Sequence, residues 1–319
     1  MKLKELLKEP YFFIHDLIFQ KYNSYLEKNI ELKNKYLDKR CFLLLPGESL
    51  TYLNLKHLRN EYTAAPGFFF LHKDFDNLEV NFMFNSGMGQ GLKRKGKDYY
   101  HNWPEQYLPS DGKYDPKLFF YYLMKKINNK SPKWFLNHDY IKYYSKIRQF
   151  DIEDERIYYL KMLNLFHKKY YKKIDLTKRF VGGGAAIINS ILVLIYMGFK
   201  EIYLCGAGYT YDPIFHQHFY DNFVVDGKLS KEHARIEILN LIANSIDKDI
   251  LQLKDIILYE KNWRAVCTRK HANNNYTNLL IKLKDVAGAN GTMIYNIVPD
   301  GFSSPVFKTI RWNQVIENK

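Results

Sequence analysis

The chain has 319 residues, which suffices for one large α/β domain or for two small ones. Its 48 Lys and Arg residues outnumber its 34 Asp and Glu residues, and the resulting net charge of +14 attracts anionic substrates, anionic membranes or nucleic acid. The lysines are scattered, and zinc-finger spacing, an aromatic RNA-binding signature and a heptad repeat are all missing, so we expect no nucleic-acid partner.

Residues 1–40 are predicted to form a highly charged N-terminal helical arm. Tyr11–Phe19 gives this arm an apolar face beside many lysines. The arm is either a helix docked on the domain or a basic amphipathic segment resting on an anionic membrane surface. No apolar core precedes a small-residue cleavage site, so we expect a cytoplasmic protein, either free or peripheral at the inner face of the membrane.

A strand is predicted at Cys41–Leu45, followed by a tight turn that contains Gly47. Ser49 is placed to cap a helix that starts near Leu50. Strand, turn and helix in this order open many nucleotide-binding α/β units. The turn is neither a Walker loop nor a GxGxxG motif, so taken alone it is better interpreted as a plain structural turn.

A second strand, or the end of one, is predicted at Phe68–Leu71, and a third strand is predicted at Val80–Phe84. Asn85 and Ser86 follow the third strand. Their amide and hydroxyl groups suit a nucleobase or a ribose, and they are also ordinary turn residues.

Residues from about 88 to 175 are predicted to form a mostly helical insertion. Helical periodicity occurs near Lys117–Ile127 and again near Ile152–Tyr171. Such an insertion can fold over an active site as a lid.

The most informative stretch is Arg179–Asp212. A glycine turn at Gly182–Gly184 opens an uncharged helix, which leads to the strand Ile202–Cys205 and a second glycine turn. A glycine turn before a helix exposes backbone N–H groups and the positive end of the helix dipole, as phosphate sites require. Arg179 beside it is either a bidentate contact for a phosphate or carboxylate, or one more surface arginine.

The charge-free run Gly182–Phe199 just reaches the length of a membrane span. The three glycines at its start, together with Asn189 and Ser190, favour a helix buried in an α/β core instead. Cys41 and Cys205 lie in apolar runs and are predicted to be inert core thiols in a reducing compartment. The 27 Tyr and 22 Phe residues suit both a core and a sugar-binding cleft.

Two histidine positions are candidates for chemistry. His216 and His218 have a spacing that suits a metal, but no carboxylate or cysteine partner is evident, so we expect no metal. His271 lies in a basic loop before a predicted helix at Tyr276–Val286, where basic neighbours favour the neutral imidazole that a general base requires. It is equally explained as an exposed loop histidine. A final strand is predicted at Met293–Val298.

Taken in order, these pieces resemble the small bacterial sialyltransferases of lipooligosaccharide synthesis and the related lipopolysaccharide, capsule and flagellin-modifying proteins called motility accessory factors. The nine residues Gly198–Gly206 (GFKEIYLCG) are similar to the family string GYKEIYLSG, and Arg179–Gly183 resembles its Arg-x-x-Ser-Gly turn. The first glycine turn matches at Gly47, Ser49 and Leu50 and departs at Leu45, Pro46 and Glu48. Gly208 stands where the family has an acidic residue.

The resemblance implies a Rossmann-like, mostly parallel sheet flanked by helices, a variant of the GT-A fold, with residues 41–319 forming a single nucleotide-sugar-binding domain. It implies a membrane-associated glycosyltransferase that moves an acidic, sialic acid-like sugar from a CMP-sugar donor to a lipid-linked or cell-surface oligosaccharide. CMP carries a single phosphate, so we expect neither a metal nor another cofactor. A homo-oligomer is compatible with the resemblance.

The resemblance also implies roles for individual residues. His271 is expected to be the general base, Arg179 to contact phosphate or acceptor, and His218 to belong to a His-Phe-Tyr string of the accessory-factor branch. We expect the amides of two bends of one sheet, at Gly47 and Gly182, to converge on the nucleotide. The expected nucleotide contacts are Gly47, Ser49, Asn85, Ser86, Gly182, Gly183, Gly206, Tyr209 and Tyr211.

Two other functions remain open. One is a pyrophosphokinase-like enzyme that uses ATP and Mg²⁺, and the other is a binding or scaffold protein that has kept the fold without the chemistry. The departures in the first turn and at Gly208 favour the second of these.

Overall fold

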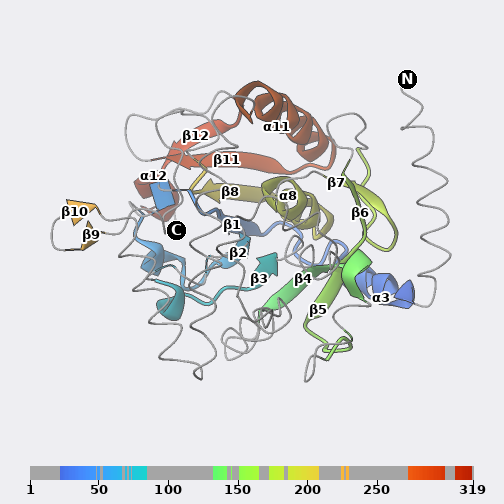
Figure 1. Cartoon of the computed structure of the whole chain (residues 1–319). Coiled ribbons are helices and arrows are strands. Elements are labelled where there is room, and N and C mark those ends of the chain that lie inside the picture. The colour runs from blue at the N-terminus through green and yellow to red at the C-terminus, as the bar shows by residue number, and fades with distance from the viewer. Residues whose placement is uncertain are drawn as a thin grey trace, which may run out of the picture.

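The protein folds around one large sheet, as a computed structural model shows (Figure 1). The structure describes residues 22–47, 49–50, 53–66, 69, 72, 74–84, 132–141, 145, 151–164, 172–182, 186–207, 224–225, 228–229, 272–298 and 306–317. These residues form an α/β protein, which confirms the predicted class.

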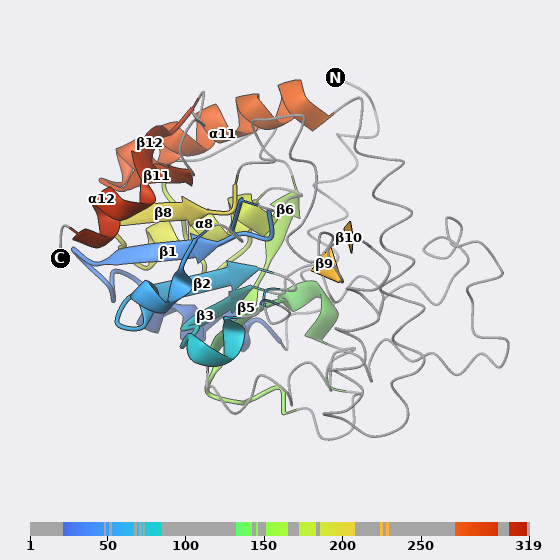
Figure 2. The ribbon, with the colours of Figure 1, turned by 90° about the vertical axis from the view of Figure 1, so that its left-hand side faces the viewer.

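The main sheet has eight strands, in the spatial order β12-β11-β8-β1-β2-β3-β4-β5. All seven neighbouring pairs are parallel, and the arrows of β1, β2 and β8 point the same way in Figure 2. The strands are β1 (Arg40–Leu44), β2 (Tyr62–Pro66), β3 (Phe82–Phe84), β4 (Lys133–Asn137), β5 (Ile157–Leu160), β8 (Glu201–Cys205), β11 (Met293–Val298) and β12 (Lys308–Arg311).

Strand β1 lies at the point where the order of the strands reverses. The chain adds β2 to β5 on one side of β1, and later adds β8, β11 and β12 on the other. Five residue pairs, from Arg40 with Glu201 to Leu44 with Cys205, join β1 to β8. The loops that follow β1 and β8 therefore leave the sheet at the same edge, where sheets of this kind place their ligands.

One face of the sheet is covered by α8 (Ala186–Tyr196) and α11 (Ala272–Ala289). Every residue of α8 from Ile187 to Tyr196 is buried, which explains its lack of charge and confirms the predicted core helix. Gly198 ends it at a φ of +89°, where a Cβ would come within 2.9 Å of the Asn34 Cα. No helix within the described ranges is long and apolar enough to cross a membrane.

The opposite face is covered by the short helix α12 (Trp312–Glu317) and by 3-10 turns between strands. Two of these turns are η4 (Leu55–Leu58) and η6 (Phe75–Asn77). The connection from β1 to β2 thus packs on one face and α11, which leads into β11, on the other.

Aromatic side chains form two ladders across neighbouring strands. Phe42, Tyr203 and Tyr295 stack on the α12 face, with ring centroids 5.0 and 5.1 Å apart. On the α8 face, Phe84 stacks on Phe135 at 4.7 Å and Phe135 on Tyr158 at 5.6 Å. For these residues, the abundance of Phe and Tyr reflects core packing.

The described part of the N-terminal arm docks on the domain. It contains α3 (Ser24–Glu27) and the 3-10 helix η2 (Lys28–Leu32), which contact β5. Leu26 and Leu32 are buried, and the Asn29 side chain donates to the carbonyls of Tyr159 and Leu176. Residues 24–32 therefore dock on the domain. The two interpretations of the arm concern Tyr11–Phe19, which lies outside the described residues.

Two small pairs of strands lie apart from the main sheet. Strands β6 (Met162–Asn164) and β7 (Phe180–Gly182) are parallel. Strands β9 (Val224–Val225) and β10 (Lys228–Leu229) are antiparallel.

The predicted helical insertion at 88–175 is wrong for its described part. Strands β4, β5 and β6 lie there, and β4 and β5 extend the main sheet. The apolar spacing in Ile152–Tyr171 resembles that of a helix, but Ile157–Leu160 is buried at every position, as a parallel strand covered on both faces requires. The predicted helix Lys117–Ile127 lies outside the described residues.

Two predictions near the first turn are also wrong. The strand, or strand end, predicted at Phe68–Leu71 is displaced: β2 already ends at Pro66, and Phe69, the described residue of that range, lies in a 3-10 turn. Ser49 does not cap a helix, because its buried Oγ has no hydrogen-bond partner among the described residues. A side-chain cap is found instead at the next helical turn, η4, where the Asn54 side chain accepts a hydrogen bond from the Lys56 amide at 3.3 Å.

The remaining predicted elements are confirmed. Strands occur at β1, β3, β8 and β11, and the final predicted helix is α11, which is longer at both ends than expected. Cys41 and Cys205 are free, buried thiols, and burial raises the pKa of each well above the usual range. Both are therefore inert at neutral pH.

Candidate functional site

The turns after β1 and β8 lie against each other at the edge where the strand order reverses. The Leu45 amide donates to the Cys205 carbonyl at 2.7 Å, and the Gly47 amide donates to the Gly206 carbonyl at 3.0 Å. The predicted nucleotide contacts Gly47 and Gly206 are thus neighbours. Since the Gly47 N–H is already bonded, it is not free to bind a phosphate.

Gly206 makes this close approach possible. Its φ is +81°, and a Cβ there would overlap the Leu45 carbonyl oxygen and lie 3.1 Å from the Leu50 Cβ. Only glycine fits a left-handed conformation with a backbone so near.

Ser49 adds a polar group to the same turn. Its side chain is almost completely buried, and within the described part of the chain its Oγ has no hydrogen-bond partner. A buried hydroxyl without a partner costs about 1–3 kcal/mol, so a ligand that bonded to it would recover that energy.

Gly182 does not belong to the sheet that carries Gly47. It ends β7, and a Cβ on it would meet Asn189 Oδ1 of α8 at 2.7 Å. The prediction that both bends belong to one sheet is therefore wrong. Gly182 instead allows β7 to pack closely against α8.

Arg179 lies directly before β7 and points to a polar cluster. Its Nη2 is 3.6 Å from Oδ1 of Asp139, and only 9% of its side chain is exposed. Asp139 belongs to the 3-10 helix η8 (His138–Tyr140), which follows β4 directly. Lys161 directly follows β5, is 2% exposed and donates to Asn23 Oδ1 at 3.0 Å. We call His138, Asp139, Lys161 and Arg179 the β4–β5 cluster.

His138 is fully buried in this cluster. Its Nε2 lies 2.9 Å from the Tyr22 carbonyl oxygen, which can only accept, so Nε2 carries the proton. Burial lowers the pKa of His138 to about 4, the bond to Tyr22 opposes this shift, and the nearby Lys161 lowers the pKa further. The imidazole is therefore neutral at physiological pH, and Nδ1 bears a lone pair.

No clear sequence motif singles out His138 or Lys161. The apolar core of β4 is only three residues long, Trp134–Leu136, and it lies within the stretch predicted to be helical. The short apolar run is followed by the polar residues Asn137, His138 and Asp139. Such a change is a weak signal for the carboxyl end of a strand, and it does not mark a functional residue.

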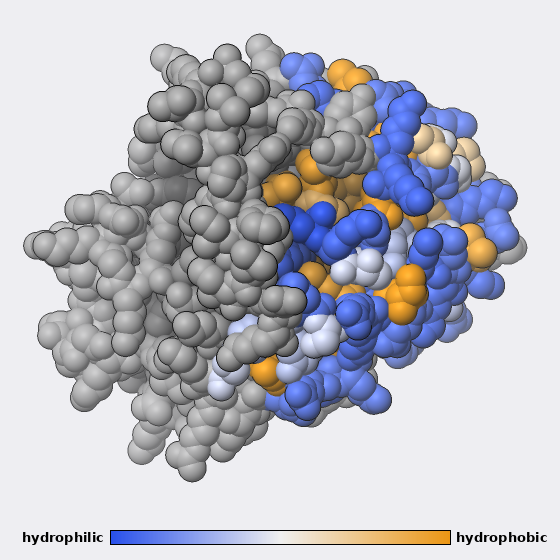
Figure 3. Space-filling model, turned by 90° about the vertical axis from the view of Figure 1, so that its right-hand side faces the viewer, coloured by the Kyte–Doolittle hydropathy of each residue, from blue (hydrophilic) through white to orange (hydrophobic). Residues whose placement is uncertain are grey.

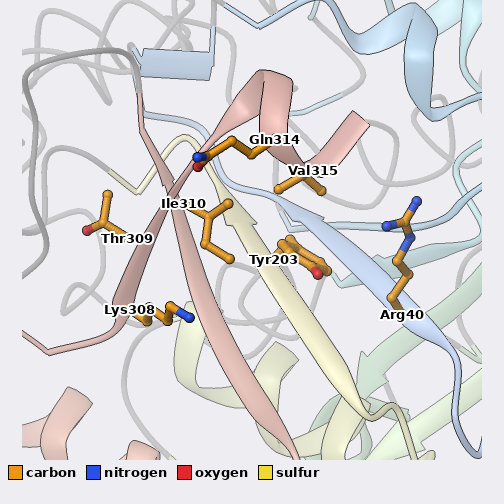
Figure 4. A pocket seen from close by; sticks show the side chains of 7 residues that line it. All are labelled: Arg40, Tyr203, Lys308, Thr309, Ile310, Gln314 and Val315. Carbon is orange, nitrogen blue, oxygen red and sulfur yellow. The ribbon is translucent and has the colours of Figure 1, made fainter. Parts of the chain in front are cut away.

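A pocket of about 390 Å³ lies elsewhere, on the α12 side of the sheet (Figure 4). Arg40 at the start of β1 bonds Glu61 at 3.1 and 2.7 Å, and the Tyr203 hydroxyl bonds Glu201 at 3.0 Å. Because Arg40 marks the amino end of β1, this pocket lies away from the Gly47 turn. Its lining comprises Arg40, Tyr203, Lys308, Thr309, Ile310, Gln314 and Val315.

The other predicted site residues lie outside the described residues. They are His218, His271, Asn85, Ser86, Gly183, Tyr209 and Tyr211. Within the described ranges, no group of three or more His, Cys, Asp or Glu side chains is placed to hold a metal ion.

We compared the chain with models of protein families, with curated proteins and with solved structures, and none of these comparisons found a match.

Proposed function

We propose that the protein is a glycosyltransferase that moves an acidic sugar from a CMP-sugar donor to a surface-glycan acceptor. The observation that carries the proposal is the meeting of the Gly47 and Gly206 turns where the strand order reverses. The Ser49 hydroxyl at this edge, which has no partner among the described residues, supports a polar ligand there.

The order of the elements supports a general base at the same edge. Helix α11 packs on β11 and leads into it through a short turn, so the helix starts near the carboxyl ends of the strands (Figure 2). His271 directly precedes Ala272, the first residue of α11. We assign His271 as the base on this placement.

In the proposed reaction, the acceptor hydroxyl gives its proton to His271 as its oxygen attacks the anomeric carbon of the donor sugar. The bond from that carbon to the CMP phosphate oxygen breaks, and CMP leaves with the electron pair. Arg179 is assigned to the phosphate or to the acceptor, where a guanidinium stabilises negative charge. Asn85 and Ser86, directly after β3, are assigned to the nucleotide.

Thermal-shift measurements test the nucleotide. A ligand that binds only the folded state at 100 times its Kd adds about 2.7 kcal/mol to the free energy of unfolding. We expect CMP to raise the Tm and ATP with Mg²⁺ to leave it unchanged. A shift with ATP and Mg²⁺ alone supports the pyrophosphokinase alternative, and no shift with either supports a non-catalytic protein.

Activity tests the base. We expect His271→Ala to lower the hydrolysis or transfer of a CMP-sugar by roughly 10²–10⁴-fold, since this is the usual contribution of a general base. His57→Ala is a control because His57 is an exposed histidine on η4. Near-normal turnover in His271→Ala would remove the assignment.

A further inference from the structure

The β4–β5 cluster lies at the carboxyl end of two parallel strands, as a ligand site in this fold does. His138 and Asp139 follow β4 directly and Lys161 follows β5 directly. The Lys161 carbonyl accepts a hydrogen bond from the Phe180 amide at 3.0 Å, which holds Arg179 beside them. Figure 1 shows α3, β5 and the β6–β7 pair gathered at this side of the molecule.

Two buried acceptors of this cluster, Nδ1 of His138 and Oδ1 of Asp139, have no hydrogen-bond donor among the described residues, and Nδ1 is the neutral one. The Tyr22 carbonyl takes the Nε2 proton of His138, so Nδ1 can only accept. Nδ1 is buried, and it has no hydrogen-bond partner in the part of the chain that the structure describes. A buried acceptor with no partner points to a group that supplies a donor.

Two cationic side chains and one carboxylate act on this acceptor: Lys161, Arg179 and Asp139, the last of which pairs with Arg179, so one positive charge is left in excess. Both Lys161 and Arg179 act electrostatically on the imidazole, and both are almost completely buried. They favour an anionic group. The Nδ1 lone pair repels an anionic oxygen and attracts a hydrogen-bond donor, so a single ligand that carries an acid and a hydroxyl together satisfies both.

We propose that His138, Lys161 and Arg179 form the subsite for the hydroxylated acid portion of the sugar. The carboxylate of that sugar lies at Lys161 and Arg179, and one of its hydroxyl groups donates to Nδ1 of His138. This inference rests on the proposed function, and it narrows the role of Arg179 from a contact for the phosphate or the acceptor to a contact for the carboxylate of the donor sugar. Asp139, with a fifth of its side chain exposed, is where the cluster meets solvent.

Two substitutions of His138 separate its two nitrogen atoms. His138→Gln keeps a donor for the Tyr22 carbonyl and loses the acceptor at the position of Nδ1. His138→Asn places an amide oxygen near the position of Nδ1 and loses the contact with Tyr22. The matched control is His57→Gln, because His57 is an exposed histidine on η4.

Calorimetric titration of the full chain with free N-acetylneuraminic acid tests the subsite. We expect His138→Gln to bind it about tenfold more weakly than the wild type, since one hydrogen bond is lost. His138→Asn should retain most of the affinity, and His57→Gln all of it. N-acetylmannosamine, which lacks the acid, and cyclohexanecarboxylate, which lacks the hydroxyls, should both bind much more weakly.

Nitrogen-15 NMR of the histidine rings gives a readout that folding alone does not change. We expect the Nδ1 resonance of His138 to shift on addition of N-acetylneuraminic acid and to stay unchanged with cyclohexanecarboxylate. Equal affinity in wild type and His138→Gln, or no binding by the wild type, overturns the proposal and leaves a buried water as the partner of Nδ1.

The outcome is distinguishable from that of the proposed function. If the protein binds CMP but does not bind the sugar acid, the subsite is rejected and the nucleotide proposal stays intact. If the protein binds the sugar acid through His138 but does not respond to CMP, the subsite is supported and the proposal of a CMP-sugar donor is rejected.

Discussion

At the residue scale, His138 couples folding to pH. Its pKa is about 4 in the folded protein and 6.5 in an unfolded chain, so the unfolded state takes up the proton first as the pH falls. The contribution of the neutral His138 to the free energy of unfolding is therefore fully present above about pH 6.5 and is lost progressively as the pH falls to about 4. The loss approaches about 3 kcal/mol, at 1.36 kcal/mol per pKa unit.

We expect His138→Gln to remove this part of the pH dependence. Urea unfolding at pH 7.5 and pH 4.5 measures it, and the wild type should lose about 2 kcal/mol more than the variant between these values. Because the carboxylates titrate in both proteins, only the difference counts. Equal losses would mean that the imidazole is not held neutral.

Gly206 is the second residue whose environment gives a clear prediction. We expect Gly206→Ala to lower the free energy of unfolding by at least about 2 kcal/mol, because the left-handed backbone alone costs about 1–2 kcal/mol and the new Cβ meets the Leu45 carbonyl oxygen. Urea unfolding followed by circular dichroism measures the change.

Gly288 in α11 is the matched control. A Cβ added there would have no described atom within 4 Å outside its own stretch of helix, and the φ of Gly288 is not positive. We expect Gly288→Ala to stabilise the protein by about 0.5–1 kcal/mol, because alanine favours a helix. A similar effect of both substitutions would contradict the close approach at Gly206.

At the element scale, Asn29 connects the N-terminal arm to the edge strand β5. Its Nδ2 donates to the carbonyls of Tyr159 and Leu176 at 2.8 and 2.7 Å, and the residue is fully buried. We expect Asn29→Ala to cost about 2–4 kcal/mol, since two buried carbonyls lose their donor. Chemical denaturation measures this loss, and hydrogen exchange at β5 locates it.

Asn290 offers the same bonding pattern at the surface. Its Nδ2 donates to the carbonyls of Lys172 and Val286 at 2.6 and 2.7 Å, but the residue is exposed. Water replaces the lost donor there, so Asn290→Ala should cost less than about 1 kcal/mol. Comparable losses in the two variants would argue against a role of burial at Asn29.

The elements also show how far a sequence can predict this fold. Strands β1 and β8 and helix α8 were predictable because each is a continuous apolar run bounded by charges or glycine. Strand β2 was missed because Ala64, Ala65 and Pro66 are poor strand formers. Their burial decides their structure, with Ala64 packed on the α8 face of the sheet and Ala65 on the opposite face.

The candidate site was predictable only in part. The glycines at positions 47 and 206 marked two neighbouring turns, because each follows a recognisable strand. The sequence signals that His138 follows a strand, but its protonation was not predictable, because it depends on the Tyr22 carbonyl, 116 residues away in the chain. Contacts of that kind arise from the tertiary fold and leave no local pattern.

At the scale of the whole molecule, the net charge of +14 favours anionic surfaces. Hydrophilic residues cover most of the described surface on the side seen in Figure 3. We propose that this charge brings the protein to its lipid-linked acceptor, with the apolar residues Tyr11–Phe19 as an anchor.

Flotation with vesicles tests this proposal. We expect the full chain to bind phosphatidylserine vesicles at low salt and to dissociate as salt screens the charge, with no binding to neutral phosphatidylcholine. A chain that lacks residues 1–21 keeps Leu26 and Asn29 and should float less. Equal flotation of the two chains would reject the anchor.

The central position of β1 has a consequence for synthesis in the cell. One neighbour of β1, β2, follows after a short connection, whereas the other, β8, comes much later in the chain. A nascent chain on the ribosome therefore carries β1 with one bare edge until β8 emerges. During that interval the backbone N–H and C=O groups along this edge of β1 are open to pairing with a wrong strand, and a chaperone that shields exposed strands would raise the yield of correctly folded protein.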